Sequence, residues 1–210
     1  MEGRAGRSAG LVLAAGGSSR LGSPKQLLPW RGRTLLEHVV AQACASGLDE
    51  VLVVLGATAE QILAQVELGR ARVVRNPDYA SGMASSLRAG LAGLGPEVQR
   101  AVVILGDQPA VSGELLDTLL ALQAEKGLPA AALSFGGLLH PPVVLHRSLW
   151  PSLRSLEGDV GCRALIRGRP ELVAALPVPG DSRHPADVDT MEDYRRWAEE
   201  LSIPGPPPAP

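Results

Sequence analysis

Short apolar runs alternate along this chain with longer segments that open on helix-capping residues. The apolar runs predict strands at residues 9–14, 51–55, 72–75, 101–105, 130–133, 143–145 and 172–176. The capping and C-terminal signals predict helices at residues 34–46, 58–68, 83–94, 112–126, 149–156, 160–166 and 190–201. Apolar strands separated by single helices are typical of an α/β fold with a mostly parallel sheet and helices on both faces.

Polar or glycine-rich segments follow three of the predicted strands. They cover residues 16–25, 76–82 and 107–109. Ligands of such sheets bind at the carboxyl ends of the strands. We therefore expect these three segments to converge on one edge of the sheet and to form a binding site there.

The first of these segments suits an anion. Its Gly and Ser residues allow several backbone N–H groups to face one ligand, and Arg20 and Lys25 are cations that suit phosphate. Gly17 and Gly22 have the spacing of a P-loop, but a P-loop would continue with Lys-Ser/Thr, and this chain continues with Ser-Pro-Lys. A phosphate-binding loop and a solvated turn are both open interpretations of this stretch alone.

Carboxylates in two distant segments suggest a metal. Asp107 directly follows an apolar strand, where it is suited to hold Mg²⁺ beside phosphates; capping of the turn before Pro109 is the alternative. Asp187 and Asp189 stand just before the last helix, where N-terminal capping alone would explain them. A second carboxylate from this segment would complete a Mg²⁺ shell.

Composition and charge limit the partners. The net charge is −2 and only 3% of the residues are aromatic, so nothing favours a nucleic-acid partner. No apolar run approaches the roughly 18 residues of a membrane span. Cys44 and Cys162 are far apart and lack metal spacing, which fits a reducing, cytoplasmic location. We expect a flexible N-terminus at residues 1–8, one domain at 9–202 and a disordered Pro-rich tail at 203–210.

The opening loop resembles a known signature. Leu13-Ala14-Ala15-Gly16, followed by Arg20-Leu21-Gly22 and Lys25, is similar to the L-A-A-G-x-S-x-R-M-G-x-x-K of MobA-like nucleotidyltransferases, and within them to the molybdenum cofactor cytidylyltransferases. Further matches run in the family's order to about residue 195: Asn76-Pro77, Gly82-Met83, Ser85-Ser86-Leu87, Gly106-Asp107-Gln108-Pro109, His140-Pro141, Gly158-Asp159, Gly161, Arg163 and Asp187-Val188-Asp189-Thr190.

The resemblance implies a Rossmann-like, three-layer α/β/α nucleotide-diphospho-sugar transferase fold. It implies transfer of CMP from CTP to the terminal phosphate of molybdopterin with Mg²⁺ as cofactor, and a molybdenum enzyme as recipient. The implied nucleotide-binding residues are Leu13, Ala14, Ala15, Gly16, Gly17, Arg20, Lys25, Asn76, Gly82, Ser86 and Asp107. Lys25 and Arg20 would be catalytic, Asp107 and Asp189 would hold the metal, and His140, Asp159 and Arg163 would face the acceptor.

The sequence departs from the family's pattern at four positions. Leu21 and Met191 replace the usual Met and Pro, Leu139 replaces the Gly that usually precedes the acceptor-side His140, and Pro142 follows the usual Pro141. Three alternatives are therefore kept. They are another NTP, such as GTP, or a sugar-phosphate acceptor; a P-loop NTPase; and a non-catalytic protein that binds the cofactor and delivers it to a molybdenum enzyme. No base is visible beside Cys162 in the sequence, so a nucleophilic role for that thiol has no support.

Overall fold

The central element of the computed structural model is a seven-stranded sheet in the order β5-β4-β1-β6-β8-β7-β9. The structure describes residues 6–16, 24–178, 187–188 and 190–200. The strands are β1 (Arg7–Ala14), β4 (Glu50–Leu55), β5 (Arg72–Arg75), β6 (Val98–Leu105), β7 (Ala130–Phe135), β8 (Leu138–His146) and β9 (Val173–Pro177). β8 runs antiparallel to both of its neighbours, and the other pairings within this sheet are parallel. The expected mostly parallel sheet is confirmed.

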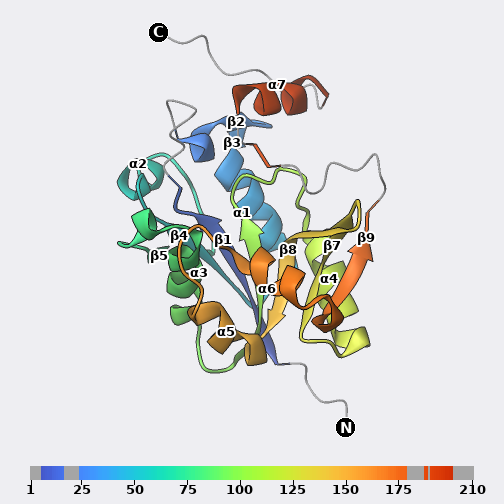
Figure 1. Cartoon of the computed structure of the whole chain (residues 1–210). Helices are drawn as coiled ribbons and strands as arrows, with labels where there is room; N and C mark the ends of the chain where they lie inside the picture. Colours follow the sequence, from blue (N-terminus) through green and yellow to red (C-terminus); the bar gives the residue numbers. More distant parts are fainter. Residues whose placement is uncertain (1–5, 17–23, 179–186, 189, 201–210) are drawn as a thin grey trace.

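Helices cover both faces of the sheet and make three layers (Figure 1). One face carries α1 (Leu35–Ala45), α2 (Ala59–Leu63) and α4 (Gly113–Lys126). The other carries α3 (Met83–Ala92), α5 (Trp150–Arg154) and α6 (Cys162–Gly168). The fold is therefore the Rossmann-like α/β/α arrangement that the sequence predicts.

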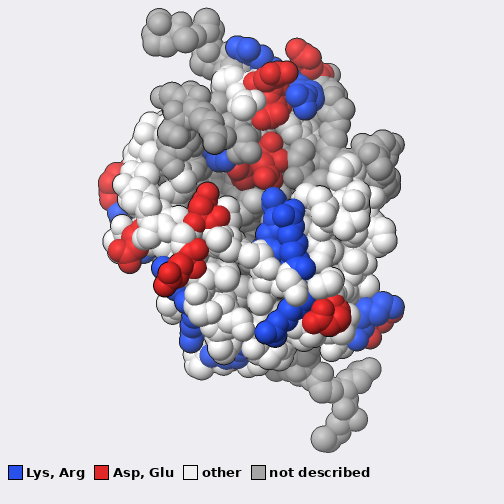
Figure 2. Space-filling view, in the orientation of Figure 1, with Lys and Arg blue, Asp and Glu red and all other residues white. Residues whose placement is uncertain are grey.

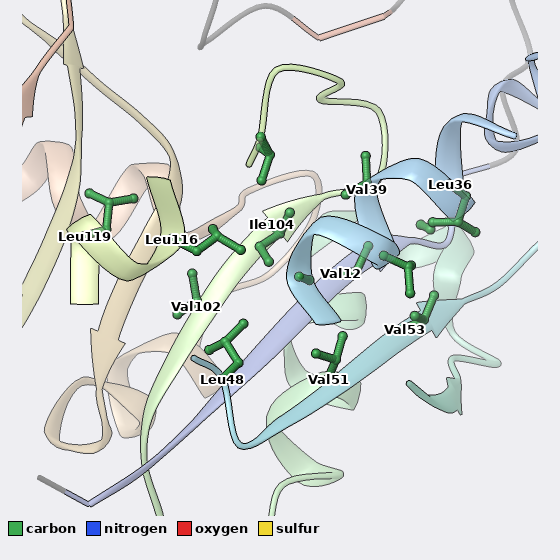
Figure 3. Close-up of a cluster of buried hydrophobic side chains, with 14 of the residues drawn as sticks. Val12, Leu36, Val39, Leu48, Val51, Val53, Val102, Ile104, Leu116 and Leu119 are labelled. Atoms are coloured by element: carbon green, nitrogen blue, oxygen red, sulfur yellow. The ribbon is translucent and has the colours of Figure 1, made fainter. Parts of the chain in front are cut away.

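Aliphatic side chains fill the space between the sheet and the helices. Figure 3 shows Val12 and Val53 of the strands packed against Leu36 and Val39 of α1, with Leu116 of α4 beside them. Each of these five side chains is fully buried. Burial of an aliphatic side chain of this size contributes about 1.5–3 kcal/mol relative to exposure, so this layer is a main source of stability.

Local signals succeed at one capping box and fail at another. Thr34 and Glu37 form the expected box, with each side chain accepting a hydrogen bond from the other residue's backbone N–H. Thr58 makes no such cap, and α2 ends at Leu63 where a helix to residue 68 is expected. The backbone N–H of Glu67 instead donates to a carboxylate oxygen of Glu37 at 2.9 Å. A tertiary contact therefore holds this segment outside the helix.

The β7–β8 hairpin extends further than the sequence predicts. Gly136 and Gly137 join the two strands with φ values of +56° and +75°, as a type I′ turn requires. β8 covers 138–146 where only 143–145 is expected, because the register shifts across Pro141 and Pro142. A bulge lets a strand carry prolines that cannot donate to a ladder. The other boundaries shift by a few residues: β1 begins at residue 7 rather than 9, and α6 at 162 rather than 160.

A small aromatic cluster lies beyond the carboxyl edge of the sheet. It joins the hairpin of β2 (Pro29–Trp30) and β3 (Arg33–Thr34) to α7 (Met191–Glu200), which Figure 1 shows at the top of the molecule. Trp30 is fully buried and packs edge-on against Tyr194 and Trp197, with ring centroids 6.4 and 6.1 Å away. The Tyr194 hydroxyl donates to the Pro29 carbonyl at 2.6 Å. The sequence does not predict the β2–β3 hairpin, because it does not reveal that α7 would cover this segment.

Across the part of the chain that the structure describes, no helix combines the length and the apolar character needed to cross a bilayer. The terminal segments expected to be flexible lie largely outside the described residues, which begin at residue 6 and end at residue 200.

Candidate active site

A cavity of about 920 Å³ opens at the carboxyl ends of β1 and β6. This volume is in the range of cavities that hold small molecules and cofactors. Ten of the predicted site residues line it: Leu13, Ala14, Ala15, Gly16, Lys25, Gly82, Ser86, Asp107, Asp159 and Arg163. The expected convergence on one sheet edge therefore occurs. Gly17, Arg20 and Asp189 lie outside the described residues.

Lys25 and Asp107 meet at this edge. Lys25 begins a single 3₁₀ turn (Lys25–Leu27), and Asp107 is the second residue after the end of β6. The ammonium group of Lys25 donates to Oδ2 of Asp107, and only 20% and 13% of the two side chains are exposed. Partial burial strengthens such an ion pair relative to one in water. A cation and a carboxylate predicted from different segments therefore share one polar site.

Gln26 holds the start of the loop in place and has no role in the sequence-based prediction. Its side chain is buried, and Nε2 donates to the carbonyl oxygens of Ala14 and Gly16, both at 3.0 Å. Its position next to Lys25 is the signal that could have drawn attention to it.

The segment before α7 reaches the same place. Gln108 is fully buried, and its Nε2 donates to Oδ1 of Asp187 at 2.7 Å. The backbone N–H of Val188 donates to the Asp107 carbonyl at 3.0 Å. These bonds place a second carboxylate, Asp187, on the wall of the cavity that holds Asp107.

The donor chemistry fits a divalent cation that is shared with a substrate. Among the described residues, no group of three or more His, Cys, Asp and Glu side chains could hold a metal by itself. Mg²⁺ is usually bound by one or two carboxylates together with substrate phosphates and water. Asp107 and Asp187, which the hydrogen bonds of Gln108 and Val188 bring to one cavity wall, supply the carboxylates that such a shell needs.

Asn76 is close to the cavity but does not line it. Its Nδ2 donates to the hydroxyls of Ser85 and Ser86 at 2.8 and 3.0 Å, and its Oδ1 accepts from the N–H of Asp78 at 3.0 Å. It is 3% exposed. The described contacts make Asn76 a support for Ser86, which lines the cavity; the nucleotide contact that the resemblance implies for Asn76 stays a prediction.

Gly82 and Asp159 bring two loops together at the N-terminus of α3. Gly82 has a φ of +96°, and a Cβ there would lie 2.4 Å from the Gly158 carbonyl. Oδ1 of Asp159 accepts a long hydrogen bond of 3.4 Å from the N–H of Met83. Gly82 is therefore required by the backbone conformation and the close approach of the two loops, whatever the ligand.

His140 lies behind the cavity wall, where its neighbour Pro141 is exposed to the cavity. Its ring packs edge-on against Phe135, with centroids 6.5 Å apart. Burial lowers the pKa of His140, and the nearby charges of Arg163 and Arg167 lower it further. The imidazole is therefore neutral at pH 7.

The outer part of the cavity is apolar and basic. Tyr79, Met83 and Val160 are large apolar side chains that expose 38–42% of their surface and line it. Arg167 joins Arg163 there, four residues later on α6. Figure 2 shows basic side chains in a band over α6, with acidic side chains directly above it toward α7. The i, i+4 spacing could have identified Arg167, but nothing local distinguished the apolar residues.

Cys162 also lines the cavity, at the start of α6. It is 4% exposed, and burial raises the pKa of its thiol to about 12. A thiol with that pKa is almost entirely protonated at neutral pH and is a poor nucleophile, so the cavity offers no activated cysteine.

Two known proteins are similar to this chain in sequence over most of its length. Nicotine blue oxidoreductase of Paenarthrobacter nicotinovorans is 38% identical over 196 residues, which cover 89% of this chain and 94% of that protein. Purine catabolism protein PucB of Bacillus subtilis (strain 168) is 30% identical over 205 residues, which cover 88% and 93%.

Solved structures are also similar to this chain, both in fold and in sequence. The crystal structure of Rv0371c from Mycobacterium tuberculosis H37Rv has a TM-score of 0.82 and 34% identity, and the match covers 93% of this chain and 99% of that one. The manganese complex of Rv0371c has a TM-score of 0.78, 33% identity and coverages of 92% and 98%. Residues 10–175 of this chain match the MobA-like NTP transferase domain. Since that match spans well over half of the chain and includes both partners of the Lys25–Asp107 ion pair, the chain belongs to the MobA-like NTP transferase family.

Proposed function

We propose that this nucleotidyltransferase moves CMP from CTP to the terminal phosphate of molybdopterin and releases pyrophosphate. The observation that carries the proposal is the Lys25–Asp107 ion pair. It lines the same cavity as Ala15 and Gly16, the first residues of the proposed phosphate loop. The Leu-Ala-Ala-Gly sequence, in which Ala15 stands where guanylyltransferases usually have Gly, supports CTP. The similarity of the other motifs to the cytidylyltransferases supports molybdopterin.

The chemistry is an in-line displacement at phosphorus. An oxygen of the acceptor's phosphate forms a bond to the α-phosphorus of CTP while the bond from that phosphorus to the bridging oxygen breaks, and pyrophosphate leaves with the electron pair. The attacking phosphate is already an anion, so no general base is needed. Positioning and neutralisation of charge supply the rate enhancement in such reactions.

We assign different roles in this reaction to different residues of the cavity. The amides of Ala15 and Gly16, with Arg20, would hold the β and γ phosphates. Lys25 would neutralise charge that develops at the α-phosphate. Asp107 and Asp189 would hold Mg²⁺, which neutralises triphosphate charge when it is bound; the manganese complex of the similar mycobacterial protein supports a divalent cation.

The outer cavity is proposed to take the acceptor. Arg163 and Arg167 lie where a second phosphate could be bound, and guanidinium groups bind phosphate with paired donors. Asp159 would contribute from the lining of this region, and the neutral imidazole of His140 would contribute from behind Pro141. Tyr79, Met83 and Val160 offer apolar surface to a flat ring.

A pyrophosphate-release assay tests the proposal. The protein is incubated with each of the four NTPs and Mg²⁺, with and without molybdopterin. We expect pyrophosphate only when CTP and molybdopterin are both present. Pyrophosphate release with GTP, or with a sugar phosphate as acceptor, would show that the proposed substrates are wrong and that the proposed reaction class is right. Tight molybdopterin binding without pyrophosphate from any NTP would favour a non-catalytic delivery protein.

The relative named nicotine blue oxidoreductase supplies a second candidate, because it is 38% identical over most of both chains. One further arm therefore follows the oxidation of NADH and NADPH with nicotine blue as electron acceptor. We expect no turnover in that arm. Redox turnover without pyrophosphate release would overturn the proposed function.

A further inference from the structure

Gln26 is buried directly beneath the start of the proposed phosphate loop, residues 15–25. It is 2% exposed, and its carboxamide nitrogen donates to the carbonyls of Ala14 and Gly16 at 3.0 Å each. A carboxamide nitrogen has two hydrogens, and this arrangement directs one to each carbonyl. We infer that Gln26 is a positioning residue, which joins the two described ends of the proposed phosphate loop and holds Ala15, Gly16 and Lys25 in place for a nucleotide.

The direction of the carbonyl groups explains why this matters. In a trans peptide the C=O and N–H groups point in opposite directions. The carbonyl of Ala14 points at Gln26, so the N–H of Ala15 in the same peptide group points away from it. Ala15 lines the cavity. Gln26, which lines the same cavity, therefore satisfies the Ala14 carbonyl and leaves the N–H of Ala15 on the opposite side of that peptide group.

The second carbonyl closes the loop. Gly16 and Gln26 are ten positions apart in sequence, and the bond between them at 3.0 Å brings the two ends of the loop together. Closing a loop before a ligand binds removes part of the ordering cost from the binding step. Lys25, next to Gln26, is held against Asp107 by the same 3₁₀ turn. The carboxamide thus couples the amide end of the loop to its cationic end.

This inference rests on the proposed nucleotide-binding role of the loop, and two variants test it. Gln26→Leu replaces the carboxamide with an apolar side chain of comparable size and removes both hydrogen-bond donors. Gln26→Glu keeps the shape and places a carboxylate against two carbonyl oxygens at high pH, but a protonated carboxyl can donate to one of them at low pH. In both variants we expect the KM for the NTP to rise at least tenfold at pH 8.5, with kcat changed less than threefold.

The pH profile separates positioning from general damage. From pH 8.5 to 6.0, the KM of Gln26→Glu relative to wild type should fall back by a factor of at least three, because protonation restores a donor. The relative KM of Gln26→Leu should stay constant. A flat profile for Gln26→Glu, a KM equal to wild type, or a loss confined to kcat would each overturn the inference.

Gln123 provides a matched control. It is another buried glutamine, 7% exposed, and its Nε2 donates to the Leu128 carbonyl at 2.6 Å near the end of α4. Gln123→Leu should lower the melting temperature without changing the KM for the NTP. If Gln123→Leu raised that KM as much as Gln26→Leu, the effect at Gln26 would be a general consequence of destabilisation and the inference would be wrong.

Hydrogen exchange without any ligand keeps this test independent of the substrate. The amides in a peptide covering residues 13–27 should exchange at least threefold faster in Gln26→Leu than in wild type, with no change in the peptide covering 119–130. Unchanged exchange in residues 13–27 would overturn the inference even if the protein bound no nucleotide at all. Faster exchange in a protein that binds no NTP would instead place the failure in the proposed function.

Discussion

The inner and outer ends of the cavity are built by different means. At the inner end, Lys25, Gln26 and Asp107 are mostly buried and hydrogen-bonded, and they come from the segments that follow two adjacent parallel strands, β1 and β6. At the outer end, Tyr79 and Val160 expose about 40% of their surface and come from loops around α3 and α6. A triphosphate has the same charged groups in every NTP, so a rigid polar site can serve it. An acceptor varies in shape, and exposed loop residues can change without disturbing the sheet. Under the proposed function, the inner end would set the reaction class and the outer end would set the acceptor.

The largest effect is expected from Lys25→Ala. Removing a charge aimed at the reacting phosphate should lower kcat by about 10²–10³-fold, as loss of one electrostatic donor does in other enzymes. Lys126→Ala is a matched control, because Lys126 also pairs with a carboxylate, Glu125, at the exposed end of α4. Steady-state kinetics and thermal denaturation measure the two variants. Near-wild-type turnover in folded Lys25→Ala would remove the inner end from the chemistry.

Asp107→Asn should come next. The amide keeps the shape but loses the charge that a divalent cation needs, so kcat should fall by about 10²-fold. A higher concentration of Mg²⁺ or Mn²⁺ should then be needed for half-maximal rate. Titration of the activity with each metal, and of Mn²⁺ binding by electron paramagnetic resonance, checks this. An unchanged metal response would contradict a metal-binding role for Asp107.

At the outer end we expect a smaller and more selective effect. Arg163→Gln removes a charged hydrogen-bond donor and should raise the KM for the acceptor about tenfold, while the KM for the NTP stays within twofold. Arg154→Gln, on α5 and outside the cavity lining, is the control. Equal changes in both KM values would show that the two ends are not separable.

The smallest expected effect is the pH dependence of the free energy of unfolding that one histidine at each end of the cavity contributes. His38 lies behind the inner end, where its Nε2–H donates to the Pro109 carbonyl at 3.1 Å. Burial is the main cause that lowers the pKa of His38, as it is for His140. The folded state thus favours neutral imidazole, and the unfolded chain binds more protons below its pKa of about 6.5. The free energy of unfolding should be highest above that pH and fall as the solution is acidified toward the lowered pKa values.

Urea denaturation between pH 7.5 and 5.5 measures this loss. His38→Gln and His140→Gln should each make the dependence on pH shallower, and the double variant should be shallower still. If one single variant removed the whole slope, only one end of the cavity would carry a proton-linked group.

The sequence anticipates most of the fold, because burial pattern and capping are local. The apolar runs of β1, β4 and β6, and the caps at Thr34 and Ser112, are where the sequence predicts them. Thr58 makes no capping hydrogen bond, and α2 ends at Leu63, before the segment in which the Glu67 N–H donates to Glu37. The sequence predicts too short a β8, because Pro141 and Pro142 suggest that the strand begins after them. The bulge that accommodates these prolines depends on the register with β7, which the sequence does not show.

The candidate site divides in the same way. The sequence by itself determined the residue types and the edge where they gather, since a polar segment after a buried parallel strand must lie at the carboxyl end of the sheet. Only the tertiary structure decided that Lys25 meets Asp107 across 82 residues. It also decided that Asn76 supports Ser86 and that Gln26 holds the loop from below. Those contacts depend on the order of the strands and on how separate loops pack together, and no local pattern in the chain encodes either one.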